Sequence, residues 1–150
     1  MQTTPEDISI MVLCEESAAI ATKSGFVGQT LPEFVALVHS ELSEALEEHR
    51  AGRRPMETHY TKSSPQLEAF VRQLYHLTPE APLPKGVSIS VPCDPEEVGA
   101  KPEGIPSELA DVVIRICHYC GVNGINLAAA IREKTAYNCT RPYKHGGKII

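Results

Sequence analysis

Two short acidic signatures stand out as the residues of this chain whose types and spacing could do chemistry. Glu41 and Glu44 are three positions apart, and so are Glu108 and Asp111. Residues three apart share a face of an α-helix, so each signature would direct two carboxylates to the same side. Four converging carboxylates repel one another unless cations lie among them, and an all-oxygen ligand set suits Mg²⁺ or Mn²⁺. The signatures therefore predict a divalent-metal site, provided that their helices pack together.

Either signature alone says little, because surface helices are rich in glutamate and two solvated helix faces would give the same pattern. Their position favours a shared site, since each signature lies at the edge of an apolar helical stripe. The apolar positions are Phe34, Val35, Val38, Leu42, Ala45 and Leu46 around the first signature, and Leu109, Val112, Val113 and Ile116 around the second. Burial of these stripes would bring the acids to the rim of a common interface.

Helix-start and helix-stop residues predict where these two helices and two further main helices lie. Their caps are Thr4, the Thr30/Glu33 capping box, Pro106 at a first helical position, and Asn126. Glycines are natural stops, so we place two of the helix ends just before Gly52 and Gly121. We predict helices over about 5–24, 32–51, 106–120 and 127–139.

Residues 53–100 differ in composition from the rest of the chain. Residues 53–63 look polar and loop-like, and Ser64-Pro65 could start a shorter helix that ends near Thr78. Seven prolines follow from Pro79 to Pro106, which disfavours helices, while residues 87–91 alternate like a strand with no evident partner. We therefore expect one all-α domain, residues 1–150, with a four-helix-bundle core and an irregular proline-rich insertion over 53–100.

A basic segment near the C-terminus could bind phosphate. Lys134 and Asn138 are four apart, so they face the same side of the last helix, and Arg141, Lys144 and Lys148 follow. A solvated tail is the alternative. In a chain that also concentrates acids, however, carboxylates that hold cations and cations that hold phosphate oxygens make up a metal–polyphosphate site.

Composition excludes several other classes of function. The net charge of −5 argues against binding a nucleic acid polymer, and no apolar run approaches the ~20 residues that span a membrane. With no signal-peptide pattern, we expect a cytoplasmic protein with free thiols among its five cysteines. Cys117 and Cys120 could suggest zinc, but a second Cys-x-x-Cys pair is missing, and burial is the simpler interpretation. We also interpret His39 as a core residue, and we find neither a Walker-type phosphate loop nor a Gly-x-Ser-x-Gly motif.

Taken together, three segments resemble the all-α nucleoside triphosphate pyrophosphohydrolases of the MazG-like superfamily. The resemblance covers about residues 30–52 and 101–148. Its signature is Glu-x-x-Glu on one helix followed by Glu-x-x-Asp on a later one. Here the three segments are HSELSEALEE from His39, PEGIPSELADV from Pro102, and KTAYNCTRPYKHGGK from Lys134.

The resemblance implies hydrolysis of a nucleoside triphosphate to the monophosphate and pyrophosphate, with Mg²⁺ or Mn²⁺, in a homodimer or homotetramer. Four side chains match the family's metal ligands: Glu41, Glu44, Glu108 and Asp111. Five match its phosphate-binding region: Lys134, Asn138, Arg141, Lys144 and Lys148. Glu48, one helical turn after Glu44, is a candidate to support the metal ligands from behind. Either Glu41 or Glu44 could be the general base. The physiological role could be cleansing of the nucleotide pool.

Two features depart from the family pattern. Sixty-three residues separate Glu44 from Glu108, where family members have a much shorter connection. The chain also has no tryptophan, which excludes stacking of a base on indole; Phe26, Tyr60 or Tyr75 could stack a base instead, although no motif supports any of them, and base preference stays open. A non-catalytic helical module that binds nucleotide or metal is the alternative function, although such a module would not need all four acids.

Overall fold

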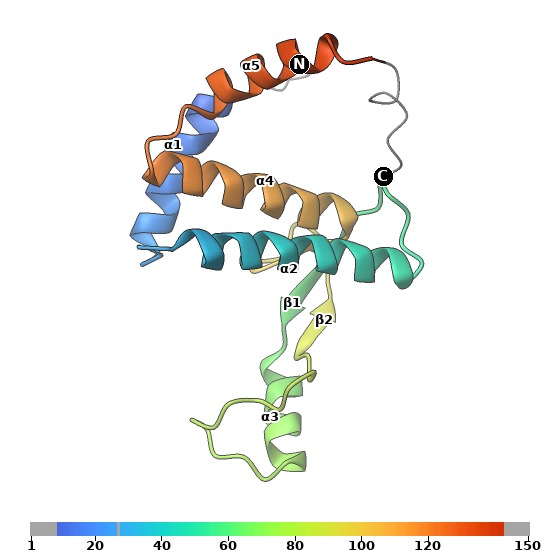
Figure 1. Ribbon diagram of the computed structural model, residues 1–150. Coiled ribbons are helices and arrows are strands. Elements are labelled where there is room, and N and C mark those ends of the chain that lie inside the picture. The colour runs from blue at the N-terminus through green and yellow to red at the C-terminus, as the bar shows by residue number, and fades with distance from the viewer. Residues whose placement is uncertain (1–8, 27, 143–150) are drawn as a thin grey trace. The chain divides into compact units, whose positions relative to one another are not determined.

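The chain is mostly helical, with one small sheet (Figure 1). The computed structural model describes residues 9–26 and 28–142. Within them lie α1 (Ile10–Lys23), α2 (Leu31–Arg50), β1 (His59–Ser63), α3 (Pro65–Leu74), β2 (Ser90–Pro92), β3 (Lys101–Glu103), α4 (Ile105–Val122) and α5 (Leu127–Cys139). The predicted helical character is confirmed, whereas the expectation of a chain without a sheet is wrong.

The chain divides into two compact units. The first comprises Met1–Glu41 and Ala110–Ile150, and the second comprises Leu42–Leu109, which includes the predicted insertion. Both boundaries fall inside helices, so α2 and α4 each begin in one unit and continue into the other.

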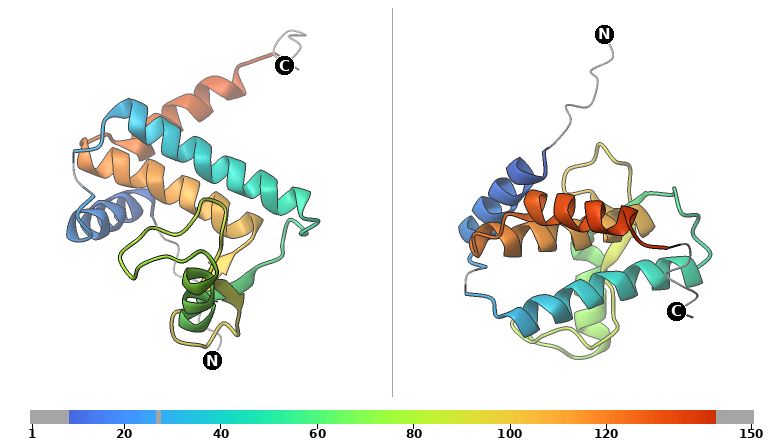
Figure 2. Two further views of the ribbon diagram at one scale, coloured as in Figure 1. Left: turned by 90° about the horizontal axis from the view of Figure 1, so that it is seen from below. Right: turned by 45° about the horizontal axis from the view of Figure 1, so that its top comes forward.

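Within the first unit, α4 lies between α1 and α2 (Figure 2). Gly121 allows α1 to approach closely: a Cβ built on it would meet the carbonyl oxygen of Cys14 at 2.4 Å. The prediction that Gly121 ends the helix is therefore wrong. Its missing side chain serves a helix–helix contact, and α4 runs on to Val122.

Three cysteines form the buried core of this contact. Cys14, Cys117 and Cys120 are almost fully buried, with Leu13, Ile116 and Leu127 packed against them at the edge. All three are free thiols, so the interpretation of Cys117 and Cys120 as buried structural residues is confirmed.

Local capping explains where most of the helices begin. Glu33 accepts a hydrogen bond from the backbone N–H of Thr30 at 2.8 Å, as the capping box predicted. The Asn126 side chain accepts from the N–H of Ala129 at 2.9 Å, and α5 has the predicted bounds. Ser9 caps α1, while the predicted start at Thr4 lies outside the described residues.

The sheet lies in the second unit and has the antiparallel order β2-β1-β3. Its central strand β1 occupies the segment that we interpreted as a polar loop, and the expected isolated strand is β2, shifted toward Pro92. Ser63 pairs with Ser90, so the partner was present but distant in the sequence. Figure 1 shows α3, which Ser64 caps as expected, at one end of the β1–β2 pair.

Gly104 joins β3 to α4 in a conformation that other residues rarely adopt. Its φ is +108°, and a Cβ there would meet the carbonyl oxygen of Glu57 at 2.5 Å. The turn that precedes Glu108 therefore requires glycine.

No single helix in the described part of the chain is both long and apolar enough to cross a membrane; α4 and α5 would satisfy that test only as a pair, bent by 115°.

Candidate metal centre

Three of the four predicted carboxylates come together where α2 and α4 face each other. Glu41, Glu108 and Asp111 each contribute one carboxylate oxygen to a group in which all such oxygens lie within 4.8 Å of one another. Glu41 and Glu108 are only 6% and 4% exposed, and Asp111 is half-buried. We refer to these three residues as the acidic cluster.

Contacts between α2 and α4 explain how residues so distant in sequence meet. The rings of Phe34 and Tyr119 stack with centroids 4.4 Å apart and planes at 17°. Two helical turns further along α2, Glu41 meets Arg115, one turn earlier on α4. The helices are therefore antiparallel here, which brings Glu41 opposite the turn that carries Asp111.

Arg115 contacts the acidic cluster through Glu41. Its Nε donates a hydrogen bond to Glu41 Oε1 at 2.7 Å, and its Nη2 contacts the same oxygen. The spacing of the acidic signatures predicted no role for Arg115, although its place four residues after Asp111 on a helix was a visible signal.

Glu44 lies outside the acidic cluster. It is exposed on the turn of α2 that follows Glu41 and belongs to the second unit. In that unit the ammonium group of Lys101 donates to Glu103 at 3.0 Å. This hydrogen bond and the charges of Glu108 and Glu44 raise the pKa of Lys101. Lys101 is thus a second cation near Glu108 and Glu44, and the sequence patterns did not predict it.

The predicted phosphate-binding residues lie on and beyond α5. Lys134, Asn138 and Arg141 are exposed, and the Lys134 ammonium group lies 5.3 Å from the centroid of the Tyr137 ring. Lys144 and Lys148 lie outside the described residues.

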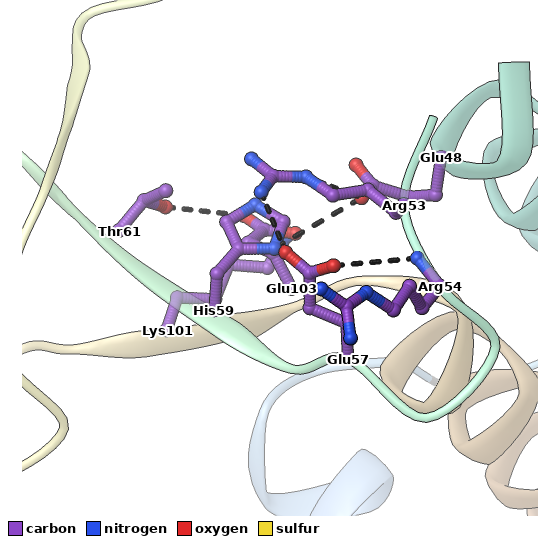
Figure 3. A network of polar contacts seen from close by, with 8 residues as sticks. All are labelled: Glu48, Arg53, Arg54, Glu57, His59, Thr61, Lys101 and Glu103. Carbon is purple, nitrogen blue, oxygen red and sulfur yellow. Dashed lines mark hydrogen bonds and ion pairs between the residues drawn. The ribbon is translucent and has the colours of Figure 1, made fainter. Parts of the chain in front are cut away.

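Glu48 takes part in a separate polar network in the second unit (Figure 3). Its Oε2 lies 3.8 Å from Arg53 Nε and 4.0 Å from His59 Nδ1. These distances are long for hydrogen bonds, and both Glu48 Oε2 and His59 Nδ1 are buried without a hydrogen-bond partner. The predicted second-shell residue is thus bordered by residues of the loop after α2 and of β1.

The same network fixes the turn that precedes β1. Arg53 Nη1 donates to Glu57 at 2.8 Å. The backbone N–H of Arg54, followed by the side chain of Arg53, lowers the pKa of Glu57. Nearby, Thr61 donates to Glu103 at 3.2 Å. We call Glu48, Arg53, Arg54, Glu57, His59, Thr61, Lys101 and Glu103 the sheet network.

A cavity of about 490 Å³ adjoins the acidic cluster within the first unit. Most of its lining surface is apolar, and its polar lining residues include Asp111 and Arg115. Phe26, one of the three aromatic residues considered for base stacking, lines it. The other two, Tyr60 and Tyr75, belong to the second unit.

His39 and the cysteines of α4 were both interpreted as core residues and not as metal ligands, with different outcomes. His39 is exposed, so the interpretation of this residue as part of the core is wrong. Burial, with the hydrogen bond to Cys14 second, raises the pKa of Cys117 to about 11, and burial raises the pKa of Cys120 as well. Zinc binds thiolates, so these environments disfavour a zinc site.

Much of the apolar stripe of α2 and α4 is accessible. Leu42, Leu46, Leu109 and Val113 are each more than 40% exposed. The helices that carry the acidic cluster thus have apolar surface that the described residues do not cover.

Comparison with known proteins gives no match: the chain matches no family profile, no curated protein and no solved structure.

Proposed function

We propose that this chain is a metal-dependent nucleoside triphosphate pyrophosphohydrolase, similar to the MazG-like superfamily. The reaction would convert a (d)NTP and water to the (d)NMP and pyrophosphate. The observation that carries the proposal is the acidic cluster, in which two of three neighbouring carboxylates are almost fully buried. Burying carboxylates costs free energy unless cations compensate them, so such a group is typical of a functional site.

The donor set fits Mg²⁺ or Mn²⁺. Glu41, Glu108 and Asp111 offer only carboxylate oxygens, which hard divalent cations prefer, and they include neither sulfur nor imidazole. Such an ion would neutralise charge on phosphate oxygens and make water more acidic.

The remaining residues have separate roles in this proposal. Glu44 lies outside the acidic cluster and is exposed, which favours it over Glu41 as the base that accepts the proton of the attacking water. Hydrolysis then breaks the α–β phosphoanhydride bond, and pyrophosphate leaves. Lys134, Asn138, Arg141, Lys144 and Lys148 would bind phosphate oxygens, as the family resemblance implies.

The cavity beside Asp111 is the proposed place of the nucleoside. Its apolar wall suits a base, and Phe26 is positioned to contact one. Cavity and acidic cluster share Asp111, so a nucleoside in the cavity would have its phosphates beside the metal ligands.

We further infer a four-helix core and self-association. The core would comprise α1, α2, α4 and α5, consistent with the contacts of α4 with α1 and α2 and of α1 with α5. The exposed apolar residues of α2 and α4 would form the contact with a second copy, in a dimer or tetramer. Light scattering that gives only the monomer mass at micromolar concentration would contradict self-association.

The test of the activity is a panel of normal and modified (d)NTPs with Mg²⁺, scored for pyrophosphate and orthophosphate separately. We expect pyrophosphate from at least one substrate and no reaction after chelation. Metal and nucleotide binding without any product would instead support the non-catalytic module, and orthophosphate release would contradict the proposed bond cleavage.

A further inference from the structure

Arg115 and a divalent cation would compete for one buried carboxylate, that of Glu41. Two nitrogens of the Arg115 guanidinium contact Glu41 Oε1, and the Glu41 side chain is 8% exposed. A charge-assisted contact of this kind is stronger than an ion pair on the surface, because little water screens it. The same carboxylate belongs to the acidic cluster.

A cation held by the acidic cluster would lie close to the guanidinium. The cluster oxygens are within 4.8 Å of one another, and one of its residues is the partner of Arg115. Two positive charges at such separations repel strongly where the local dielectric constant is low. The ion pair should therefore weaken metal binding, and metal binding should weaken the ion pair.

The Arg115 side chain can reach an alternative anionic partner in the cavity. Its side chain is 36% exposed and lines the 490 Å³ cavity together with Asp111. The planar guanidinium binds phosphate oxygens as readily as carboxylates. A triphosphate beside Asp111 would offer it an anionic partner in exchange for Glu41.

We propose that Arg115 exchanges partners during substrate binding: it pairs with Glu41 at first, competes with the metal for that carboxylate, and then binds a phosphate oxygen of the substrate. This inference rests on the proposed function. Its consequence is positive coupling, since each ligand removes an obstacle to the other, and such coupling must be reciprocal.

The experiment measures Mn²⁺ affinity by titration calorimetry for the wild-type protein and for Arg115→Gln, without and with inorganic tripolyphosphate. Without tripolyphosphate, we expect Arg115→Gln to bind Mn²⁺ about tenfold more tightly, because a hydrogen-bonded competing charge has gone. Tripolyphosphate should increase Mn²⁺ affinity in the wild-type protein by a larger factor than in the variant. A purely structural role for Arg115 would not change this coupling factor.

Two further variants keep the outcome interpretable. Arg50→Gln removes a similar arginine from the exposed Arg50–Glu47 pair of α2 and should change Mn²⁺ affinity less than about twofold. Arg115→Lys keeps the charge without the planar fork and should lie between the wild-type protein and Arg115→Gln. It also replaces Arg115→Gln in the test if that variant does not fold.

The outcomes separate this inference from the proposed function. Equal Mn²⁺ affinity in the wild-type protein and the Arg115 variants overturns the competition, and an equal coupling factor overturns the partner exchange. If neither the wild-type protein nor any variant binds Mn²⁺, the proposed metal site fails as well. Binding in Arg115→Gln alone would support the competition strongly.

Discussion

The acidic cluster and the sheet network both gather carboxylates, but two carboxylates of the acidic cluster are more deeply buried. In the sheet network, Arg53 lies beside both Glu48 and Glu57, the backbone N–H of Arg54 donates to Glu57, and Lys101 pairs with Glu103 (Figure 3). The acidic cluster has three carboxylates, two of them almost fully buried, and one of these, Glu41, pairs with Arg115.

That difference separates a scaffold from a candidate site. The carboxylates of the sheet network are partly exposed and lie beside arginine and lysine, and their effect is to hold the segments that contribute to the network. Neighbouring carboxylates that are almost fully buried have free energy to gain from an added cation, because burial and mutual repulsion both disfavour their charged form. The two groups should therefore respond differently to the same kind of substitution.

The largest difference should appear in turnover. Glu41→Gln or Asp111→Asn, each of which removes a proposed metal ligand, should lower kcat about 1,000-fold. Glu57→Gln makes the same chemical change in the sheet network and should leave kcat within about twofold. Pyrophosphate release measures the rates, and circular dichroism should show unchanged helicity. A wild-type rate in either cluster variant would count against the assignment.

Sequence patterns predicted the helices well because their boundaries depend on local residues. To cap its helix, Asn126 needs only the backbone N–H of Ala129, three positions later, and the capping box of Thr30 and Glu33 is equally local. Gly121 was misinterpreted as a helix end, because glycine is required there by the close approach of Cys14 on another helix. Strand β1 was missed because its partner β2 begins only at Ser90, a non-local pairing that no short motif encodes.

In the candidate site, too, local features were predictable from the sequence and contacts between helices were not. Spacing within each helix predicted carboxylates on shared faces, and three of them do meet. Spacing could not predict that Glu44 lies outside the acidic cluster, nor that Arg115 reaches across 74 positions to Glu41. Contacts between helices depend on their packing, which one sequence does not reveal.

Two close-approach glycines allow the stability of the two regions to be compared. Gly104→Ala should destabilise the protein by about 3 kcal/mol, because it adds a clash with the Glu57 carbonyl to an unfavourable positive φ. Gly121→Ala should cost about 2 kcal/mol, because its clash with Cys14 occurs at ordinary helical φ. Urea denaturation measures both.

Gly99→Ala is the control for these glycines. Gly99 has a φ of +81°, but nothing lies within 4 Å of its added Cβ, so a loss of about 1 kcal/mol is expected. Equal losses for Gly99 and Gly104 would show that the close approach to Glu57 contributes nothing.

A smaller effect should distinguish the aromatic residues of the two units. Phe26→Leu should raise KM about fivefold with kcat nearly unchanged, because it removes an aromatic face from the cavity beside Asp111. Tyr75→Leu, the matched change in the second unit, should leave KM unaltered. The opposite result would place the base near the second unit.

The smallest effect should be a pH dependence of stability that involves Glu57. Its pKa is lowered from 4.5, chiefly by the Arg54 backbone N–H and then by Arg53. Its stabilising contribution is therefore fully present above pH 4.5 and is lost as the pH falls through the lower folded pKa. Glu57→Gln should flatten this part of the stability–pH curve in urea titrations, and an unchanged curve would contradict the role of the carboxylate.

The measurement that tests the central claim most directly is anomalous diffraction from crystals soaked in Mn²⁺. It locates the ion without any assumption about the substrate. We expect a manganese peak within coordination distance of Glu41, Glu108 and Asp111, and its loss in Glu41→Gln crystals. A peak in the sheet network instead, or none at the acidic cluster at saturating Mn²⁺, would contradict the account.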